Sequence, residues 1–343
     1  MHEIRSHSPS PAAFNQVKCI KGFETIRADY AVYLTDESKL SAKPFDYLFF
    51  PKNEAELSAV IQEMSRSNTA VTIASARTGL VGGCVPPRGA LVSMELFDRV
   101  QSVYFNTAYD EWRVCAQANV SLKTLDSMLR IKQFPDLESG EIDPAIKQRY
   151  EQFKQDPDFY FYPPDPTEMS ASLGGTVITN ASGARTYRYG PTRSWVRAVR
   201  VLLADGETLD IPRGKYFASP AGQFVVWNSA GEPRTITIPD YPLPMTKSTT
   251  GFYTVPHMDL IDLFIGSEGV LGVITQVEVA LLKKEPKISI VQFLDSDHQA
   301  VALAIKLRAD SRLQFDFLEF YSGSALNLLR ELQKSEPSVV GMP

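Results

Sequence analysis

The sequence has few residues of the kinds that bind metals or form cross-links. Its three cysteines, Cys19, Cys84 and Cys115, are widely spaced and form no Cys-x-x-Cys pair. An odd number at such spacing argues against a disulfide framework, a zinc ribbon or an iron–sulfur site, and it fits a reducing compartment. The four histidines are scattered along the chain, so the sequence predicts no metal site.

Long apolar runs and an excess of basic residues are also missing. No stretch reaches the ~18 to 20 apolar residues of a membrane helix, and the polar residues 1–13 lack the apolar core of a secretory signal. We therefore expect a cytoplasmic location, with peripheral attachment to a membrane left open. The net charge of −5 indicates no sequence-wide basic surface, so no nucleic-acid partner is expected.

Two common nucleotide-binding motifs are absent as well. No Gly-x-Gly-x-x-Gly opens a helix with an acidic residue ~20 positions on, which argues against a Rossmann domain. No Gly-x-x-x-x-Gly-Lys-Ser/Thr occurs, which argues against a P-loop nucleotidase.

What is present indicates a multidomain globular protein. The 343 residues, 44% hydrophobic and 22% charged, exceed one ordinary core and suggest two or three domains. We expect an N-terminal lead-in over 1–43 and a main body over 44–285, with subdomains of about 44–115 and 116–285. A further domain is expected to begin at Pro286.

In the main body, strand and helix patterns alternate, which is typical of an α+β or α/β layer. Asn53 is a plausible N-cap for a helix whose apolar residues recur at helical spacing, and Ser121 is another possible cap. The chain between 212 and 245 is rich in Pro, Gly and Ser, so a long irregular excursion is expected. Strands are expected at 47–50, 70–74, 91–94, 109–118, 196–203, 208–211 and 270–282, and helices after Asn53, at 121–131 and at 145–153.

After Pro286 the pattern changes to strand, helix, strand, helix, over 288–293, 298–308, 315–321 and 325–332. This is the first half of a ferredoxin-like layer. Such a sheet is normally completed by more strands, so we expect an exposed apolar edge or face that is prone to pairing.

Three glycine-rich motifs could carry chemistry. Residues 75–83, Ser-Ala-Arg-Thr-Gly-Leu-Val-Gly-Gly, directly follow an expected strand. Successive backbone N–H groups in such a turn form a concave anion site suited to a pyrophosphate, although a plain connecting loop has the same composition. The second motif combines Tyr-Pro-Pro-Asp-Pro at 162–166 with a small-residue segment at 173–183 and Tyr189-Gly190. The third is Gly-Ser-Glu-Gly at 266–269, before an expected strand.

In this order the motifs resemble the FAD-binding domain of the vanillyl-alcohol oxidase / p-cresol methylhydroxylase (PCMH) superfamily. Within it, the chain is most similar to the D-lactate dehydrogenase and glycolate oxidase flavoprotein-subunit branch. The resemblance covers roughly residues 44–285 and includes pieces at 201–206 and 247–252. It implies an α+β fold: a two-subdomain PCMH-type FAD-binding domain, followed by the start of a ferredoxin-like FAD-linked oxidase C-terminal domain.

The resemblance also implies non-covalent FAD, because the first loop has no histidine where covalent members of the superfamily place one. The 75–83 loop would hold the pyrophosphate, the second motif the ribityl, phosphate and ring parts, and Ile274 the adenine side. The implied cofactor contacts are Ser75, Ala76, Arg77, Thr78, Gly79, Leu80, Gly82, Gly83, Pro164, Asp165, Gly174, Gly175, Asn180, Ser182, Gly183, Tyr189, Gly190 and Ile274.

The implied activity is oxidation of a 2-hydroxy acid, of the D-lactate, glycolate or D-2-hydroxyglutarate type, to the 2-oxo acid. Electrons would pass to an external acceptor: a quinone, a cytochrome or an electron-transfer protein. The substrate needs a cation for its carboxylate and a base for its hydroxyl. Lys247 and Arg185 are candidates for the cation, with Arg188 and Arg193 close to Arg185 in sequence. The sequence offers no convincing base.

Family members are usually longer and carry a His-x-Gly-Asp-Gly-Asn-x-His-type segment that this chain does not reach. One alternative is therefore a flavin-binding fragment or subunit that needs another chain for catalysis. A reductase of enolpyruvyl sugar nucleotides would share the flavin fold but require NADPH, and the 163–166 and 266–269 motifs fit it less well. A purely structural role is the remaining alternative.

Overall fold

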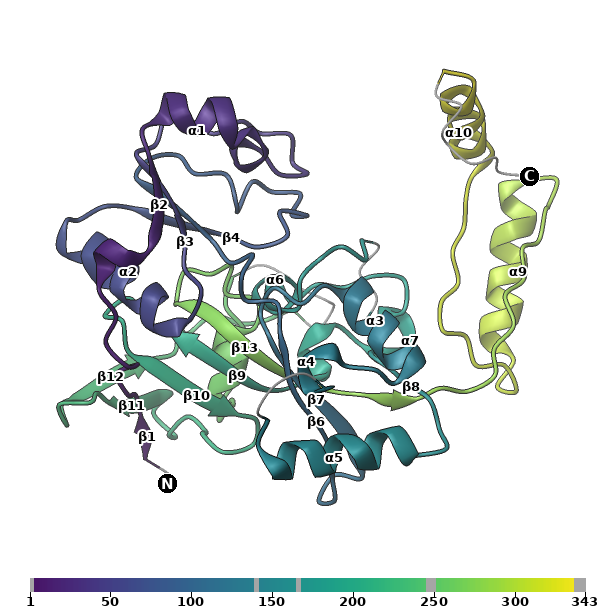
Figure 1. Cartoon of the computed structure of the whole chain (residues 1–343). Helices are drawn as coiled ribbons and strands as arrows, with labels where there is room; N and C mark the ends of the chain where they lie inside the picture. The colour runs from purple at the N-terminus through teal and green to yellow at the C-terminus, as the bar shows by residue number, and fades with distance from the viewer. Residues whose placement is uncertain (1–2, 139–141, 165–167, 245–250, 336–343) are drawn as a thin grey trace.

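The structure, a computed structural model, describes residues 3–138, 142–164, 168–244 and 251–335. Asp165 and Lys247, two residues with predicted roles, lie outside these ranges. Figure 1 shows a body built from two main sheets with their helices, and a C-terminal pair of helices that stands apart from it. The predicted α+β class is confirmed by this mixture of helices and sheets.

The first sheet has four strands in the order β2-β3-β5-β4, with β3, β5 and β4 parallel and β2 antiparallel at the edge. Its strands are β2 (Lys18–Lys21), β3 (Tyr47–Phe50), β4 (Val71–Ala74) and β5 (Ala90–Ser93), and its helices are α1 (Phe23–Asp29) and α2 (Glu54–Arg66). Three predicted strands are confirmed here, and β2 of the lead-in adds a fourth. Asn53 caps α2, since its side chain accepts a hydrogen bond from Glu56 N at 2.9 Å.

Strand β3 reads as a continuous apolar run because both of its faces are covered. Phe49 packs toward α2 in one buried cluster, whereas Leu48 and Phe50 pack with Ile26 of α1 in another. The lead-in therefore supplies one of the two layers that enclose this sheet. Its short 3-10 turn at Ala31–Leu34 follows α1.

The second sheet has five antiparallel strands in the order β10-β9-β13-β7-β6, and each of them contributes residues to the largest buried cluster. Helix α5 packs on β6, and α6 packs on β13 and β7. The sequence missed β6 but correctly predicted the other four strands. The strands are β6 (Val100–Asn106), β7 (Glu111–Gln117), β9 (Val196–Leu202), β10 (Thr208–Pro212) and β13 (Val273–Ala280). The helices are α3 (Leu122–Ile131), α4 (Pro135–Glu138), α5 (Pro144–Gln155), α6 (Leu173–Ile178), α7 (Thr186–Tyr189) and α8 (Leu260–Phe264).

The excursion over 212–245 is not wholly irregular, which corrects the prediction. It forms the hairpin β11 (Gln223–Trp227) and β12 (Pro233–Thr237), and β11 pairs in parallel with β1 (Ile4–Arg5) near the start of the chain. Within β11, the side chains of Phe224 and Val226 are buried. The Pro, Gly and Ser residues lie in the flanking turns. Their abundance led to the prediction of an irregular segment, although a short alternating strand lies between them. The remaining short elements are β8 (Tyr160–Phe161), β14 (Leu282–Lys283), and 3-10 turns at Phe14–Gln16 and Thr192–Ser194.

The C-terminal part contains helices α9 (Asp297–Ala309) and α10 (Gly323–Ser335), as predicted, but not the predicted strands at 288–293 and 315–321. A strand exists only where another strand pairs with it, and none of the described residues lies beside these segments as a partner. No helix within the described ranges is both long enough and apolar enough to span a membrane.

Candidate functional site

The two main sheets approach each other just after β7, at Ala118 and Asn119. Ala118 N donates to Thr275 O at 3.0 Å, and Ala118 O accepts from Gly174 N at 2.7 Å. The Asn119 side chain reaches the first sheet, where its Oδ1 accepts from Ser75 Oγ at 2.5 Å. The end of one strand therefore contacts the first two glycine-rich motifs and β13, the strand that follows the third.

The first motif leaves β4 as an exposed loop. Arg77 has a φ of 57° and Gly82 a φ of 77°, both in the left-handed region. Among the residues that the structure describes, none accepts a hydrogen bond from the backbone N–H groups of 76–83. Leu80 and Val81 are each 76% exposed, which is unusual for apolar side chains in a turn. This loop therefore presents unpaired donors, as an anion-binding loop does.

In the second motif, glycine permits close packing against the end of β7. A Cβ on Gly174 would lie 2.6 Å from Ala118 Cβ and 3.0 Å from its carbonyl oxygen, so no side chain fits there. Ser172 caps α6 by accepting from Gly175 N at 3.2 Å. After α6, Asn180 adopts a left-handed φ of 47°. Its Oδ1 accepts from Arg193 N at 3.0 Å and fixes the turn.

The third motif is attached to the C-terminal end of α6. Gly266 N donates to Val177 O at 3.0 Å, and Glu268 N donates to Ile178 O at 2.9 Å. Glu268 has a φ of 54°, so each motif contains a non-glycine residue in the left-handed region. Such conformations are found preferentially at functional sites. Ser267 Oγ is buried and has no hydrogen-bond partner within the described part of the chain.

The first and third motifs are close to each other around Cys84. Its thiol lies near the charges of Asp36, Arg77 and Glu268, and Ser75 N donates to it. Burial raises the pKa of the Cys84 thiol, so it stays protonated near neutral pH. Desolvation also raises the pKa of the Glu268 carboxyl, although the residue as a whole is exposed. A carboxyl and a thiol thus lie beside the loop of free N–H groups.

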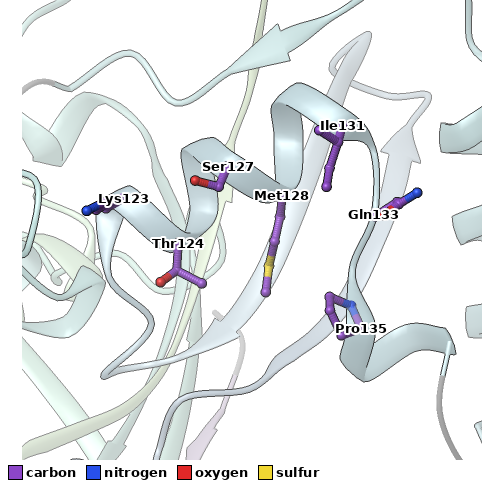
Figure 2. A pocket seen from close by; sticks show the side chains of 7 residues that line it. All are labelled: Lys123, Thr124, Ser127, Met128, Ile131, Gln133 and Pro135. Carbon is purple, nitrogen blue, oxygen red and sulfur yellow. The ribbon is translucent and has the colours of Figure 1, made fainter.

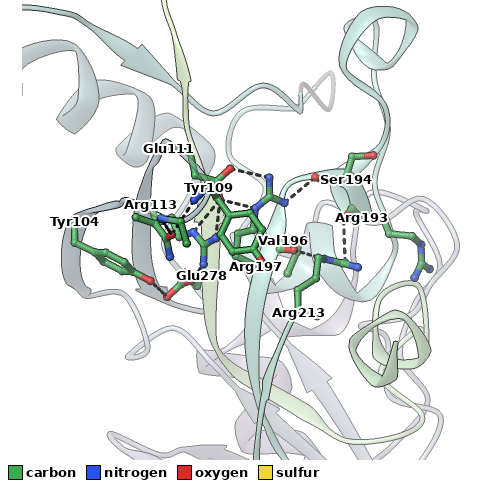
Figure 3. Close-up of polar contacts among 12 residues, drawn as sticks. Tyr104, Tyr109, Glu111, Arg113, Arg193, Ser194, Val196, Arg197, Arg213 and Glu278 are labelled. Atoms are coloured by element: carbon green, nitrogen blue, oxygen red, sulfur yellow. Dashed lines mark hydrogen bonds and ion pairs between the residues drawn. The ribbon is translucent and has the colours of Figure 1, made fainter. Parts of the chain in front are cut away.

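The three arginines near the second motif lie in different environments. Arg193 is a half-buried structural residue: its guanidinium donates to Asp262 Oδ1 at 2.8 Å and to Ile265 O, directly before the third motif. Arg213 binds the same carboxylate, and Figure 3 shows it also reaching the carbonyl oxygens of Val196 and Arg193. Arg188 instead donates a hydrogen bond to Asp316 Oδ1, in the C-terminal part, at 2.8 Å.

Arg185, the predicted substrate-side cation, lines a cavity of about 250 Å³ together with Tyr162 and Pro164. Its guanidinium lies 5.7 Å from the Phe161 ring centre. The structure thus brings Arg185 and Pro164 together. A second, more apolar cavity of about 370 Å³ lies against α3 and Pro135, and none of the predicted site residues lines it (Figure 2).

The other predicted contacts have different surroundings. The Tyr189 hydroxyl donates to Asp316 Oδ1 at 2.8 Å, so this side chain faces the C-terminal part. Gly190 has a φ of 76° beside Ser194, and Gly183 N donates to Thr186 Oγ1 at 3.0 Å. Ile274 is buried opposite Val201 within the second sheet. Ser182 lies between Asn180 and Gly183 in the turn after α6.

The residues present fit a dinucleotide cofactor. The loop at 76–83 offers unpaired N–H donors to a pyrophosphate, and the buried Ser267 Oγ lacks a partner that a bound ligand could supply. No side chain fits at Gly174, so the backbone of α6 itself packs against the end of β7. Together with the two-sheet fold, these features define a dinucleotide-binding domain.

The comparisons with known proteins identify the dinucleotide. The family described as FAD binding domain matches residues 45–146 and 155–212. Glycolate oxidase subunit GlcD of Bacillus subtilis (strain 168) is 25% identical over 329 residues, which cover 96% of this chain and 55% of that protein. D-lactate dehydrogenase of Anaerostipes hadrus is 27% identical, covering 66% of this chain and 34% of that protein.

D-2-hydroxyglutarate dehydrogenase of Stutzerimonas stutzeri (strain A1501) is 23% identical, covering 85% of this chain and 51% of that protein. Among solved structures, alkyldihydroxyacetonephosphate synthase aligns with 78% of this chain and 40% of its own, at 16% identity and a TM-score of 0.49. The chain thus spans about a third to a little over half of the length of these curated relatives.

Residues 45–146 and 155–212 thus match an FAD-binding domain, and the chain is similar to the glycolate oxidase subunit and to D-lactate dehydrogenase. Its cofactor is FAD, as the resemblance implied.

Sequence reasoning did not find Asn119 or Asp36, which lie outside the glycine-rich motifs. Asn119 follows a strand and precedes a cap, so its bridge to Ser75 appears only once the two sheets are placed. Asp36 precedes Ser38 in an Asp-x-Ser turn, a weak signal that many surface turns share.

Proposed function

We propose that this chain binds FAD non-covalently and serves the oxidation of a 2-hydroxy acid to the 2-oxo acid, with an external electron acceptor. The observation that carries the proposal is the loop of unpaired N–H groups at 76–83 beside the other two motifs. The names of the relatives supply the substrate class: glycolate, D-lactate and D-2-hydroxyglutarate.

In this proposal the cofactor contacts are those that the resemblance implies. The 75–83 loop and Ile274 contact the cofactor through main-chain atoms. The 75–83 loop holds the pyrophosphate, and the segment from Gly174 to Gly183 lies along the ribityl and ring parts. Bound FAD would supply a two-electron acceptor for the substrate carbon that carries the hydroxyl. Arg185 would hold the substrate carboxylate, and its cavity of about 250 Å³ suits a small acid.

The cofactor part is tested at Gly83, because a Cβ there would meet nothing within 4 Å and φ is not in the left-handed region. Gly83→Asp adds a carboxylate to the pyrophosphate loop without a steric clash. Gly83→Asn is the matched control, of equal size and without charge. We expect Asp to weaken FAD binding about 10- to 100-fold more than Asn, an effect that high salt reduces.

The first measurement is the visible spectrum of the purified chain before and after denaturation. A flavin spectrum that is released into the supernatant indicates dissociable FAD. A protein that stays colourless and takes up no added FAD contradicts the proposal. Anaerobic bleaching with D-lactate, glycolate and D-2-hydroxyglutarate then tests the substrate class, and Arg185→Met should raise the substrate concentration needed for bleaching.

A second candidate, a flavin-binding chain that needs another chain or segment for catalysis, is favoured by the C-terminal part. There, large apolar side chains are exposed on both helices and on the segments before and between them, including Ile288, Phe293, Ile305, Phe320 and Leu328. Such a surface is typical of a protein interface. A yellow protein that no hydroxy acid bleaches, and that an added partner renders active, would support this candidate.

A further inference from the structure

The lead-in lies across the first motif, although it precedes the residues that match the FAD binding domain family. The Arg77 guanidinium lies 4.5 Å from the ring centre of Tyr33, and Glu37 N donates to Arg77 O at 3.2 Å. A Cβ on Gly82 would lie 2.7 Å from Leu40 Cδ1. The segment 33–40 therefore holds the loop in its left-handed turn and closes one side of it.

Asp36 is the polar centre of this segment. It is only 4% exposed, and its Oδ1 accepts hydrogen bonds from Ser38 N at 2.9 Å and from Ser38 Oγ. Its other oxygen, Oδ2, has no hydrogen-bond partner among the described residues. This oxygen lies 4.0 Å from the position that a Cβ on Gly79 would occupy, so it faces the middle of the loop.

A buried carboxylate oxygen without a partner is costly, and such groups in native proteins are normally satisfied by a donor. The nearby cation does not supply one: Arg77 stacks on Tyr33 and donates to Ser75 O at 3.5 Å. A phosphate cannot be the partner, because two anions would repel each other. A neutral donor that arrives with the ligand and lies next to its pyrophosphate would satisfy this oxygen.

We propose that Asp36 is a cofactor-binding residue whose Oδ2 accepts a hydrogen bond from a sugar hydroxyl of FAD, on the ribityl chain or the ribose. These hydroxyls flank the pyrophosphate on its two sides, which matches the position of Oδ2 beside the pyrophosphate loop. The inference rests on the proposed FAD binding. It adds that the lead-in forms one wall of the site.

Asp36→Asn tests the inference with little change in shape. Ser38 N fixes the orientation of the amide, because it needs an oxygen acceptor at the Oδ1 position. An NH2 group then stands where Oδ2 stood and cannot accept a hydrogen bond. We expect FAD to bind the apoprotein about 10- to 100-fold more weakly, measured by flavin fluorescence titration, with the melting temperature of the apoprotein unchanged.

Ser38→Ala is the matched control. It removes the hydroxyl that donates to Oδ1 and accepts from Leu40 N, and so perturbs the turn, but it leaves Oδ2 in place; FAD affinity should therefore stay close to that of the wild type. ADP, which has the ribose and the pyrophosphate but no ribityl chain, separates the two hydroxyl sources. Asp36→Asn weakens ADP binding by the same factor as FAD binding if the ribose is the partner, and leaves ADP binding unchanged if the ribityl chain is.

The inference and the proposed function fail in different ways. If the wild-type chain binds no FAD, the proposed function fails. If the wild type binds FAD and Asp36→Asn binds it equally well, only the inference is overturned. A loss of affinity that is accompanied by a lower apoprotein melting temperature, and that Ser38→Ala reproduces, would also overturn it, because the turn and not Oδ2 would then be the cause.

Discussion

The two-sheet body and the C-terminal part after Lys283 follow similar hydrophobic patterns but differ in packing. In the body, Leu48 of β3 is fully buried between two layers. In the C-terminal part, Ile288 and Ile290 stand in an equally apolar, alternating run and remain 86% and 76% exposed. Figure 1 shows the same contrast, since α9 and α10 lie apart from the sheets.

This difference shows that an apolar strand pattern indicates only a preference for extended backbone. Whether a strand forms depends on pairing with a neighbouring strand. Strands β3 and β7 have partners on both sides, and one partner of each comes from far away in the sequence: β5 for β3 and β13 for β7. The run at 288–293 has the same preference without a partner among the described residues. Its apolar side chains therefore remain available to whatever completes the layer.

The largest expected contrast concerns one apolar side chain in each region. Leu48→Ala should lower the free energy of unfolding of the body by about 2–5 kcal/mol, because it leaves a cavity between α1 and the sheet. Ile290→Ala should change it by less than about 0.5 kcal/mol, because that side chain is exposed. Urea denaturation monitored by tryptophan fluorescence measures both. A cost above about 1 kcal/mol for Ile290→Ala would show that the C-terminal part packs against the body.

A smaller contrast concerns two helical glycines. Gly174→Ala places a methyl group 2.6 Å from Ala118 Cβ, where α6 packs on the end of β7, and overpacking of this kind costs about 1–3 kcal/mol. We expect lower thermal stability and weaker FAD binding together. Gly323→Ala, at the start of α10, meets nothing within 4 Å and is the control. If both substitutions leave FAD binding unchanged, the close contact at Gly174 does not shape the cofactor site.

These expectations show what local sequence could and could not predict. The caps Asn53 and Ser121 and the helices that follow them were predicted correctly, because a cap and a helical repeat act within a few residues. Strand β6 was missed because its sequence, Val-Gln-Ser-Val-Tyr-Phe-Asn, does not alternate strictly. Its burial depends on α5, which lies across it.

The candidate site shows the same division. The glycines at 79, 82 and 83 indicated the loop because a left-handed turn and close approach favour glycine. The side chains that join the loops, Asn119 and Asp36, carry no such local requirement. Their partners Ser75 and Gly79 are 44 and 43 residues away, so only the packed structure reveals them.

The smallest expected effect concerns the contact between the two regions. Asp316 accepts hydrogen bonds from Arg188 and Tyr189 at 2.8 Å each and also binds Lys287. Burial alone raises the pKa of this carboxyl, but the hydrogen bonds outweigh it and hold the pKa below its usual value. The contact is therefore complete above about pH 3.9, the ordinary value for Asp, and is lost as the pH falls through the lowered pKa.

Asp316→Asn removes the charge at constant pH and so reports on the same contact. We expect limited trypsin cleavage after Lys306 or Arg308 to become about fivefold faster, as for the loss of roughly 1 kcal/mol, while the unfolding of the body stays unchanged. Asp310→Asn is the control, because that carboxylate binds only the neighbouring Arg312 within the described chain. If trypsin cleaves the two variants at the same rate, the contacts of Asp316 do not hold the C-terminal part against the body.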